Sequence, residues 1–167
     1  MTQLRITEIF YSLQGEALTV GLPTIFIRLT GCPLRCGYCD TAYAFNGGEL
    51  WEIDAILAKM RNWNCSHVTV TGGEPLAQPA VLELLKRLAD ENYDVSLETS
   101  GAMDVANVDE RISIVMDLKT PGSGEMSKNR YENCYYLGYK DQVKVVICNR
   151  QDYDWAKFKV AELQLQE

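Results

Sequence analysis

The feature that most constrains this chain is a group of three cysteines on one short segment. Cys32, Cys36 and Cys39 are arranged as C-x3-C-x2-C, directly after an apolar run over residues 24–29. Such a run predicts a buried strand, so the three thiols are expected on one loop at a strand end. Three thiols converging on one loop indicate a site for a metal ion or a metal cluster.

Two kinds of site are compatible with this spacing. Thiolates bind iron-sulfur clusters, usually four to a cluster, so three close cysteines would leave one iron open to an outside ligand. The alternative is a structural zinc site with a more distant fourth ligand, and the candidates are Cys65, His67, Cys134 and Cys148. No second cysteine pair stands at zinc-ribbon spacing. Arg35 is expected to favour the thiolate forms.

Composition and charge indicate one globular domain whose partner is a small molecule. The 167 residues are 47% hydrophobic and 23% charged, which is enough for one core and too little for two ordinary domains. A net charge of -7 without a Lys/Arg run argues against a nucleic-acid surface. No apolar run approaches the roughly 18 residues of a membrane span. Three of the six cysteines share one loop, which fits a reducing compartment, so we expect a cytoplasmic protein with no membrane partner.

The alternation of strand-like and helix-like segments predicts an α/β fold. Strands are predicted at 4–10, 24–30, 67–71, 93–98, 112–117 and 142–148. Helices are predicted at 49–64, 78–92 and 152–163, the last with Trp155, Phe158 and Leu163 facing inward. Strands that alternate with helices imply right-handed β-α units on a mostly parallel sheet.

Polar residues next to the predicted strands are candidate binding groups. Gln14 and Glu16 stand in a loop expected at 11–16, where an amide and a carboxylate can pair with a heterocycle. An ordinary surface turn is the simpler interpretation of that loop. Arg28 is the one charge in its apolar strand, so it needs a carboxylate partner, either in the protein or on a ligand.

Gly72 and Gly73 follow the strand predicted at 67–71 and precede a helix. A glycine-rich turn in that position lets backbone groups approach a ligand at a strand's carboxyl end. Two adjacent glycines alone are weak evidence for a ligand site, and a plain tight turn is the default interpretation.

Several motifs together carry a family resemblance. The cysteine motif, with Tyr38 before its last cysteine, resembles the radical S-adenosylmethionine (SAM) superfamily. Within it, the chain is similar to 7-carboxy-7-deazaguanine synthase through F-Y-S-L-Q-G-E (10–16), I-F-I-R-L (25–29), C-D-T (39–41) and T-G-G-E-P (71–75). The resemblance implies an open, partial (β/α) barrel. It also implies a single radical SAM core domain over residues 1–167, which we expect to lack the family's C-terminal segment.

The resemblance also implies an activity. Such a lyase converts 6-carboxy-5,6,7,8-tetrahydropterin to 7-carboxy-7-deazaguanine with loss of ammonia, in deazapurine and queuosine biosynthesis. The implied cofactors are a 4Fe-4S cluster, SAM and Mg2+. The implied partners are the pterin substrate, a low-potential electron donor such as a flavodoxin, and a second copy of the chain in a homodimer.

Site residues follow from the same resemblance. Cys32, Cys36 and Cys39 correspond to the cluster ligands, and Thr41 to the magnesium ligand, although Thr41 could instead cap a loop. The residues implied to contact SAM are Tyr38, Cys39, Asp40, Gly73, Asp117, Leu118 and Lys119. Some members carry Ser-Pro-Lys at 117–119, so only Lys119 matches there. The residues implied to contact substrate are Leu13, Gln14, Gly15, Arg28 and Thr71.

Two other functions share part of this pattern. A glycyl-radical activating enzyme has the three cysteines and a small size, but it does not explain the loop at 13–16 or Arg28. A non-enzymatic electron carrier or zinc module explains the cysteines and leaves residues 72–75 without a role.

Overall fold

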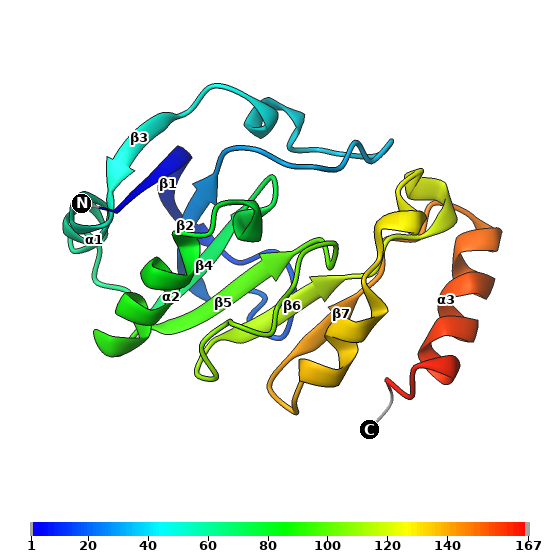
Figure 1. Cartoon of the computed structure of the whole chain (residues 1–167). Helices are drawn as coiled ribbons and strands as arrows, with labels where there is room; N and C mark the ends of the chain where they lie inside the picture. Colours follow the sequence, from blue (N-terminus) through cyan, green and yellow to red (C-terminus); the bar gives the residue numbers. More distant parts are fainter. Residues whose placement is uncertain (1, 166–167) are drawn as a thin grey trace.

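One seven-stranded sheet runs through the molecule, in the order β3-β1-β2-β4-β5-β6-β7 (Figure 1). The computed structural model describes residues 2–165. The strands are β1 (Gln3–Leu13), β2 (Pro23–Leu29), β3 (Glu49–Glu52), β4 (His67–Gly72), β5 (Asp94–Thr99), β6 (Ser113–Asp117) and β7 (Gln142–Lys144). Because β3 and β7 lie at opposite edges, the sheet is open. The predicted α/β fold with an open, partial barrel is confirmed.

Strand direction divides the sheet into two parts. Strands β2, β4, β5, β6 and β7 are parallel, whereas β1 is antiparallel to both β2 and β3. The connection 14–22 between β1 and β2 is too short for the crossover that a parallel pair needs. The mostly parallel sheet was therefore predicted correctly, but residues 11–13 belong to β1 and not to the expected loop.

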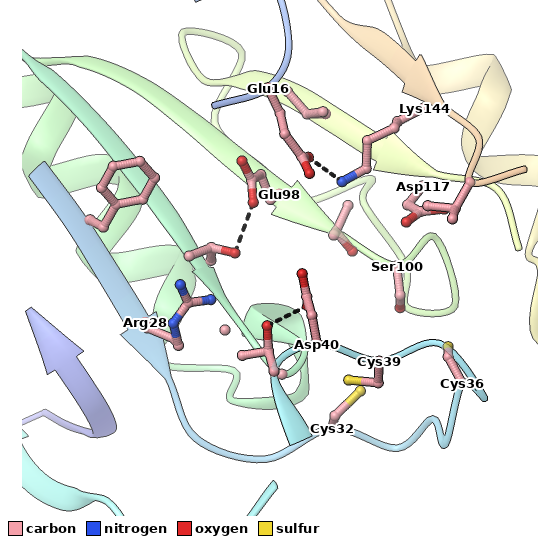
Figure 2. Close-up of a pocket in the computed structure, with 18 of the residues that line it drawn as sticks. Glu16, Arg28, Cys32, Cys36, Cys39, Asp40, Glu98, Ser100, Asp117 and Lys144 are labelled. Atoms are coloured by element: carbon pink, nitrogen blue, oxygen red, sulfur yellow. Dashed lines mark hydrogen bonds and ion pairs between the residues drawn. The ribbon is translucent and has the colours of Figure 1, made fainter. Parts of the chain in front are cut away.

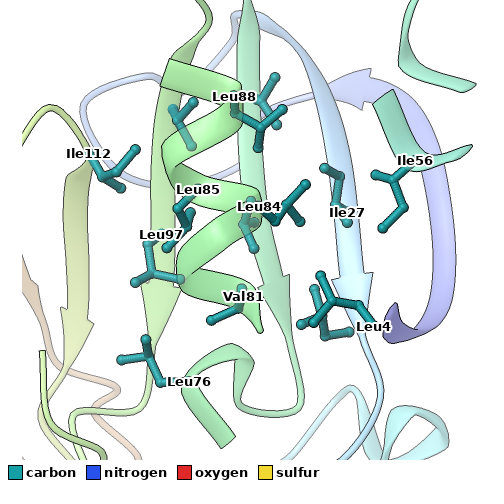
Figure 3. Packing of buried hydrophobic residues seen from close by; sticks show 14 of the residues in the cluster. Leu4, Ile27, Ile56, Leu76, Val81, Leu84, Leu85, Leu88, Leu97 and Ile112 are labelled. Atoms are coloured by element: carbon teal, nitrogen blue, oxygen red, sulfur yellow. The ribbon is translucent and has the colours of Figure 1, made fainter. Parts of the chain in front are cut away.

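The hydrophobic core lies between the sheet and the helices α1 (Ile53–Met60) and α2 (Val81–Asp90). Figure 3 shows α2 lying over the sheet and running along its strands, with its leucines among the buried side chains. Val81, Leu84, Leu85 and Leu88 repeat at i, i+3, i+4 and i+7, and all four are fully buried. This stripe fixes α2 on one face of the sheet and leaves the carboxyl ends of the strands free for a site.

The predicted helix at 49–64 begins late. Residues 49–52 form the edge strand β3, paired with the start of β1, and α1 starts only at Ile53. Leu50 fits the helical spacing, yet its side chain is 57% exposed on that edge. Pairing with β1 therefore overrode a local apolar period that also suited a helix.

The C-terminal part also differs from its prediction. Strand β7 spans only three residues, and Ile147 and Cys148 beyond it are exposed. Helix α3 (Arg150–Glu162) lies beside the β7 edge in Figure 1, and Trp155 and Leu163 pack against the core as expected. Phe158 faces outward at 61% exposure, so its predicted inward position is wrong. Within residues 2–165, no helix is long and apolar enough to cross a membrane.

Replacing Leu84 by Ala should lower the free energy of unfolding by about 2–5 kcal/mol, because it opens a cavity in a fully packed core. Urea unfolding followed by circular dichroism measures this difference. The matched change Leu50→Ala, on the exposed edge strand, should alter it by less than about 0.5 kcal/mol. Equal losses in the two variants would contradict the described core.

Candidate active site

A cavity of about 600 Å³ lies at the carboxyl ends of the parallel strands. Its walls come from the ends of β2, β4, β5, β6 and β7 and from the cysteine loop. This is the end at which β/α barrels place their sites, and the volume falls in the range of small-ligand pockets. Figure 2 shows Arg28 on one side of the cavity and Asp117 and Lys144 on the other.

The structure brings nearly all the predicted site residues together. The predicted residues that line the cavity are Leu13, Gln14, Gly15, Arg28, Cys32, Cys36, Tyr38, Cys39, Asp40, Thr41, Thr71, Gly73, Asp117 and Lys119. Leu118 is the exception, because its side chain is buried in the hydrophobic core. Alternation of side chains at the strand end turns Leu118 away from the face that carries Asp117 and Lys119.

The cysteine loop is held against two neighbouring segments by backbone hydrogen bonds. The N–H of Glu74 donates to the carbonyl of Gly31 at 2.8 Å, and the N–H of Gly37 donates to the carbonyl of Ser123 at 2.9 Å. The loop is therefore fixed between the turn after β4 and the segment after β6. Figure 2 shows the thiols of Cys32 and Cys39 close together and that of Cys36 further along the loop.

Arg35 does not lie against the thiols. Its Nη1 donates to the carbonyls of Cys32 and Leu34 at 2.8 and 2.6 Å, and its guanidinium stacks over Phe45. Burial raises the pKa of the Cys32 and Cys36 thiols. The cation that opposes this rise at Cys36 is Lys119. The prediction that Arg35 favours the thiolates is thus wrong for these two cysteines, because its side chain is engaged with the loop's own backbone.

Glu74 anchors the turn after β4, and sequence reasoning gave it no role. Its side chain is fully buried and accepts hydrogen bonds from Thr99 Oγ1, from the N–H and Oγ of Ser100, and from the N–H of Leu76. A buried carboxylate is tolerated only with such partners. Glu74 therefore ties the turn to the end of β5. The sequence signal for this role was a single acidic residue in the T-G-G-E-P-L segment, whose other residues are uncharged.

Gly72 and Gly73 are required by close backbone packing. A Cβ at Gly72 would stand 2.5 Å from the carbonyl oxygen of Leu29, and one at Gly73 would stand 2.3 Å from that of Gly31. A Cβ at Gly73 would also lie 2.8 Å from the Cβ of Cys32. The two glycines thus let the turn lie directly against the cysteine loop.

Two buried polar atoms on the cavity wall have no partner among the described residues, namely the Tyr38 hydroxyl and Asp117 Oδ1. The other oxygen of Asp117 accepts a hydrogen bond from Lys119 Nζ at 2.9 Å, and that Nζ lies over the Tyr38 ring. Burial, together with the nearby Asp117 carboxylate, raises the pKa of Tyr38, so the phenol stays protonated. This wall offers a donor and an acceptor to a ligand.

The opposite wall carries a connected polar group. Gln14 is only 4% exposed although Gly15 and Glu16 beside it are exposed, so the loop lies at the surface but turns the Gln14 side chain into the protein. Its Nε2 donates to Thr69 Oγ1 at 3.0 Å and to Glu98 Oε1 at 3.4 Å. Thr71 Oγ1 donates to Glu98 Oε2 at 2.9 Å. Glu98 was not among the residues predicted to contact substrate, although it ends a predicted strand.

The connection 14–22 reaches from β1 to the far edge of the sheet. Glu16 forms an ion pair with Lys144 on β7, and the N–H of Leu18 donates to Gln142 Oε1 at 2.8 Å. Burial is the largest influence on the pKa of Lys144 and lowers it, but the hydrogen bond to Glu16 together with the negative charges of Glu16, Asp117 and Glu98 outweighs burial, so the pKa is raised. Lys144 therefore stays charged. Only the tertiary structure brings it to the cavity.

Arg28 and Thr41 each have a partner in the protein. Arg28 Nε donates to Glu8 Oε1 at 2.7 Å, while the residue also lines the cavity. Thr41 Oγ1 donates to Asp40 Oδ1 at 2.8 Å, and it makes no side-chain cap to the short helix that follows. The Thr41 oxygen therefore keeps lone pairs for a cation, and the capping interpretation has no support.

The donor set fits a multi-iron cluster better than a single metal ion. Cys32, Cys36 and Cys39 all line the cavity, and the thiol of Cys36 lies further along the loop than those of Cys32 and Cys39 (Figure 2). A zinc ion needs ligands within about 2.3 Å of its centre, whereas a four-iron cluster takes one thiolate per iron over a wider span. Of the proposed fourth zinc ligands, Cys65 donates instead to the carbonyls of Pro23 and His67.

Comparison with known proteins decides the family. The family model of the radical SAM superfamily matches residues 26–121. The 7-carboxy-7-deazaguanine synthase of Koribacter versatilis is 43% identical over 156 residues, which cover 92% of this chain and 69% of that protein. The chain belongs to the 7-carboxy-7-deazaguanine synthase family. The synthase of Chlorobaculum tepidum is 41% identical over 95% of this chain and 73% of that protein.

The fold of this synthase-family chain also matches a solved structure. The crystal structure of QueE from Escherichia coli superimposes with a TM-score of 0.78, over 100% of this chain and 81% of that one, at 24% identity. Membership of the radical SAM superfamily brings a 4Fe-4S cluster and SAM as cofactors. Neither the glycyl-radical activating enzyme nor the zinc or electron-carrier module is favoured by these relatives.

Glu74→Ala should lower the free energy of unfolding of this synthase-family protein by at least about 1–3 kcal/mol, because it strands buried donors on Thr99 and Ser100. Thermal and urea unfolding measure the loss. Glu91→Ala, which removes a surface partner of Arg61, is the matched control and should change little. An unchanged stability in Glu74→Ala would contradict the anchoring role.

Proposed function

We propose that this protein catalyses the SAM-dependent conversion of 6-carboxy-5,6,7,8-tetrahydropterin to 7-carboxy-7-deazaguanine, with loss of ammonia. The observation that carries the proposal is the composition of one cavity. The cysteine loop forms one side of it, and Gln14, Arg28 and Glu98 stand on another. A cavity of about 600 Å³ is large enough for ligands of this class.

Cys32, Cys36 and Cys39 would hold the cluster, one iron each, and leave the fourth iron to SAM. When bound, the cluster supplies the electron that cleaves SAM to a hydrogen-abstracting radical. The chain's own contribution is to hold these thiols in a loop fixed on both sides, at Gly31 and Gly37. A fixed loop keeps the cleavage point at a constant place relative to the substrate wall.

Tyr38, Asp40, Gly73, Asp117 and Lys119 would surround SAM. The unpartnered Asp117 Oδ1 is an acceptor suited to a ribose hydroxyl, and the Tyr38 hydroxyl is a protonated donor. Lys119 neutralises the charge of Asp117 without covering that oxygen. Gly73 brings the backbone after β4 close to the cysteine loop, where the amino acid part of SAM would lie.

The substrate would bind on the wall of Gln14, Arg28, Thr71 and Glu98, flanked by Leu13 and Gly15. Amide and carboxylate groups can pair with the N–H and C=O edge of a pterin ring. The free end of the Arg28 guanidinium can take the substrate carboxylate through two parallel hydrogen bonds. Thr71 and Gln14 hold the Glu98 carboxylate in place, which orients it toward the ring.

Residues around the opening of the cavity would bind Mg2+ and limit the access of water. Thr41 and Asp40 supply oxygens to Mg2+, whose remaining ligands would come from substrate and water. The ion pair between Glu16 and Lys144 holds the connection 14–22 across the cavity and limits the access of water. A low-potential donor such as a flavodoxin would provide electrons, the active form would be a homodimer, and the product would enter deazapurine and queuosine biosynthesis in the cytoplasm.

Anaerobically reconstituted protein should contain about four irons per chain, and Cys36→Ala should lose SAM cleavage, because the site has no spare thiol. The measurements are iron analysis and 5′-deoxyadenosine release after reduction. Cys148→Ala, which alters an exposed cysteine away from the cavity lining, should behave like the wild type. If Cys36→Ala still cleaves SAM, the assignment of the three cysteines as cluster ligands is wrong.

Arg28→Lys should raise KM for the carboxypterin roughly tenfold or more while leaving SAM affinity nearly unchanged, because lysine keeps the charge and loses the planar fork. Steady-state kinetics with the carboxypterin, alongside equilibrium SAM binding, separate the two effects. A parallel loss of SAM affinity would show that Arg28 supports the site as a whole and does not bind the substrate.

A further inference from the structure

Glu8 faces the cavity side of the sheet because β1 contains a bulge. Ile6 is a core residue of β1, and Glu8 lies opposite Arg28 of β2, so the register shifts at Thr7. Without this extra residue, Thr7 would oppose Arg28, and Glu8 would lie opposite the buried Ile27. Bulges of this kind re-aim side chains next to active sites. Here the bulge brings a carboxylate onto the face of the sheet that carries Arg28.

The Glu8 carboxylate holds Arg28 by one atom only. Glu8 Oε1 accepts a hydrogen bond from Arg28 Nε at 2.7 Å. Among the described residues, nothing hydrogen-bonds to Nη1 or Nη2 of Arg28, and its side chain is 16% exposed at the cavity wall. The Arg28 guanidinium also lies over the rings of Phe10 and Tyr43, at 5.8 and 5.9 Å. The outer edge of the guanidinium is thus free, while its plane is fixed.

The same carboxylate oxygen of Glu8 also reaches the segment that follows the cysteines. Tyr43 OH donates to Glu8 Oε1 at 2.9 Å. Tyr43 lies in the short helix Ala42–Phe45, directly after Thr41. One acceptor atom therefore joins Arg28 on β2 to the segment that leads from the cysteine loop. A shift of either partner would move the other.

We propose that Glu8 is a positioning residue for the reaction. By holding Arg28 at Nε, it aims Nη1 and Nη2 at the carboxylate of the substrate. Glu8 also accepts a hydrogen bond from the Tyr43 hydroxyl, and this contact sets the position of the Arg28 guanidinium relative to the cysteine loop. This inference rests on the proposed function, because it takes Arg28 as the group that binds the substrate carboxylate.

A purely structural ion pair would behave differently. The Glu8 side chain is 38% exposed and that of Arg28 is 16% exposed, so removal of Glu8 should cost some stability but leave the Arg28 charge with enough access to solvent for the protein to fold. Loss of Glu8 should therefore leave the fold intact and change the geometry of Arg28. The expected effect is on the substrate and not on SAM.

The test is Glu8→Ala in anaerobically reconstituted protein. Equilibrium binding of the carboxypterin to the unreduced, SAM-loaded protein should weaken roughly tenfold, the scale of one hydrogen bond to a charged group. KM should rise by a similar factor, whereas SAM affinity should stay near the wild-type value and the melting temperature should fall by only a few degrees. Glu8→Gln keeps an acceptor oxygen for Arg28 Nε and Tyr43, so it should recover most of the lost affinity.

A double-mutant cycle tests whether Glu8 acts through Arg28. In an Arg28→Ala background, Glu8→Ala should cause no further loss of carboxypterin affinity, because its target is already gone. Glu91→Ala is the matched control, since it removes the carboxylate partner of Arg61 far from the cavity lining. That control should leave carboxypterin binding unchanged.

The outcomes separate this inference from the proposed function. If the wild type converts the carboxypterin and Glu8→Ala binds it equally well, the Glu8 proposal alone is wrong. Equal losses of SAM and carboxypterin affinity, or fully additive effects with Arg28→Ala, overturn it in the same way. If the wild type neither binds nor converts the carboxypterin, the proposed function fails, and the role of Glu8 fails with it.

Discussion

The site depends on one buried carboxylate. Glu74 has no exposed surface, and its oxygens are shared among donors from Thr99, Ser100 and Leu76. Moving an unpaired carboxylate into such an environment would be strongly unfavourable, so these donors must stay in place. Because the N–H of Glu74 also bonds to Gly31, the same residue joins the end of β5 to the start of the cysteine loop. The floor of the cavity is therefore one connected unit.

Close backbone contact also fixes the position of the cysteine loop against the turn after β4. Gly72 and Gly73 pass so near Leu29 and Gly31 that no side chain fits between them. Any larger residue would move the cysteine loop away from the turn after β4. Part of what resembles a ligand-binding glycine motif is thus a packing requirement of the protein itself, and the two roles are compatible at one position.

Two charged pairs at the cavity each leave part of a charged group without a hydrogen-bond partner among the described residues. Asp117 pairs with Lys119 through one oxygen, and Arg28 pairs with Glu8 through Nε alone. A buried or half-buried charge needs a partner, but a partner that used every donor or acceptor would leave nothing for a ligand. This incomplete pairing reconciles stability with binding.

The sequence by itself determined where most strands and helices lie along the chain. It also determined the cysteine loop and most of the cavity residues. Apolar runs and the i, i+3, i+4 spacing of α2 are local signals, and they predicted the structure correctly wherever pairing with a distant segment did not compete with them. Only the tertiary structure decided that residues 49–52 form an edge strand, that Lys144 reaches Glu16, and that Glu8 opposes Arg28. These outcomes depend on pairing between distant segments and on a one-residue bulge, and neither leaves a periodic trace in the sequence.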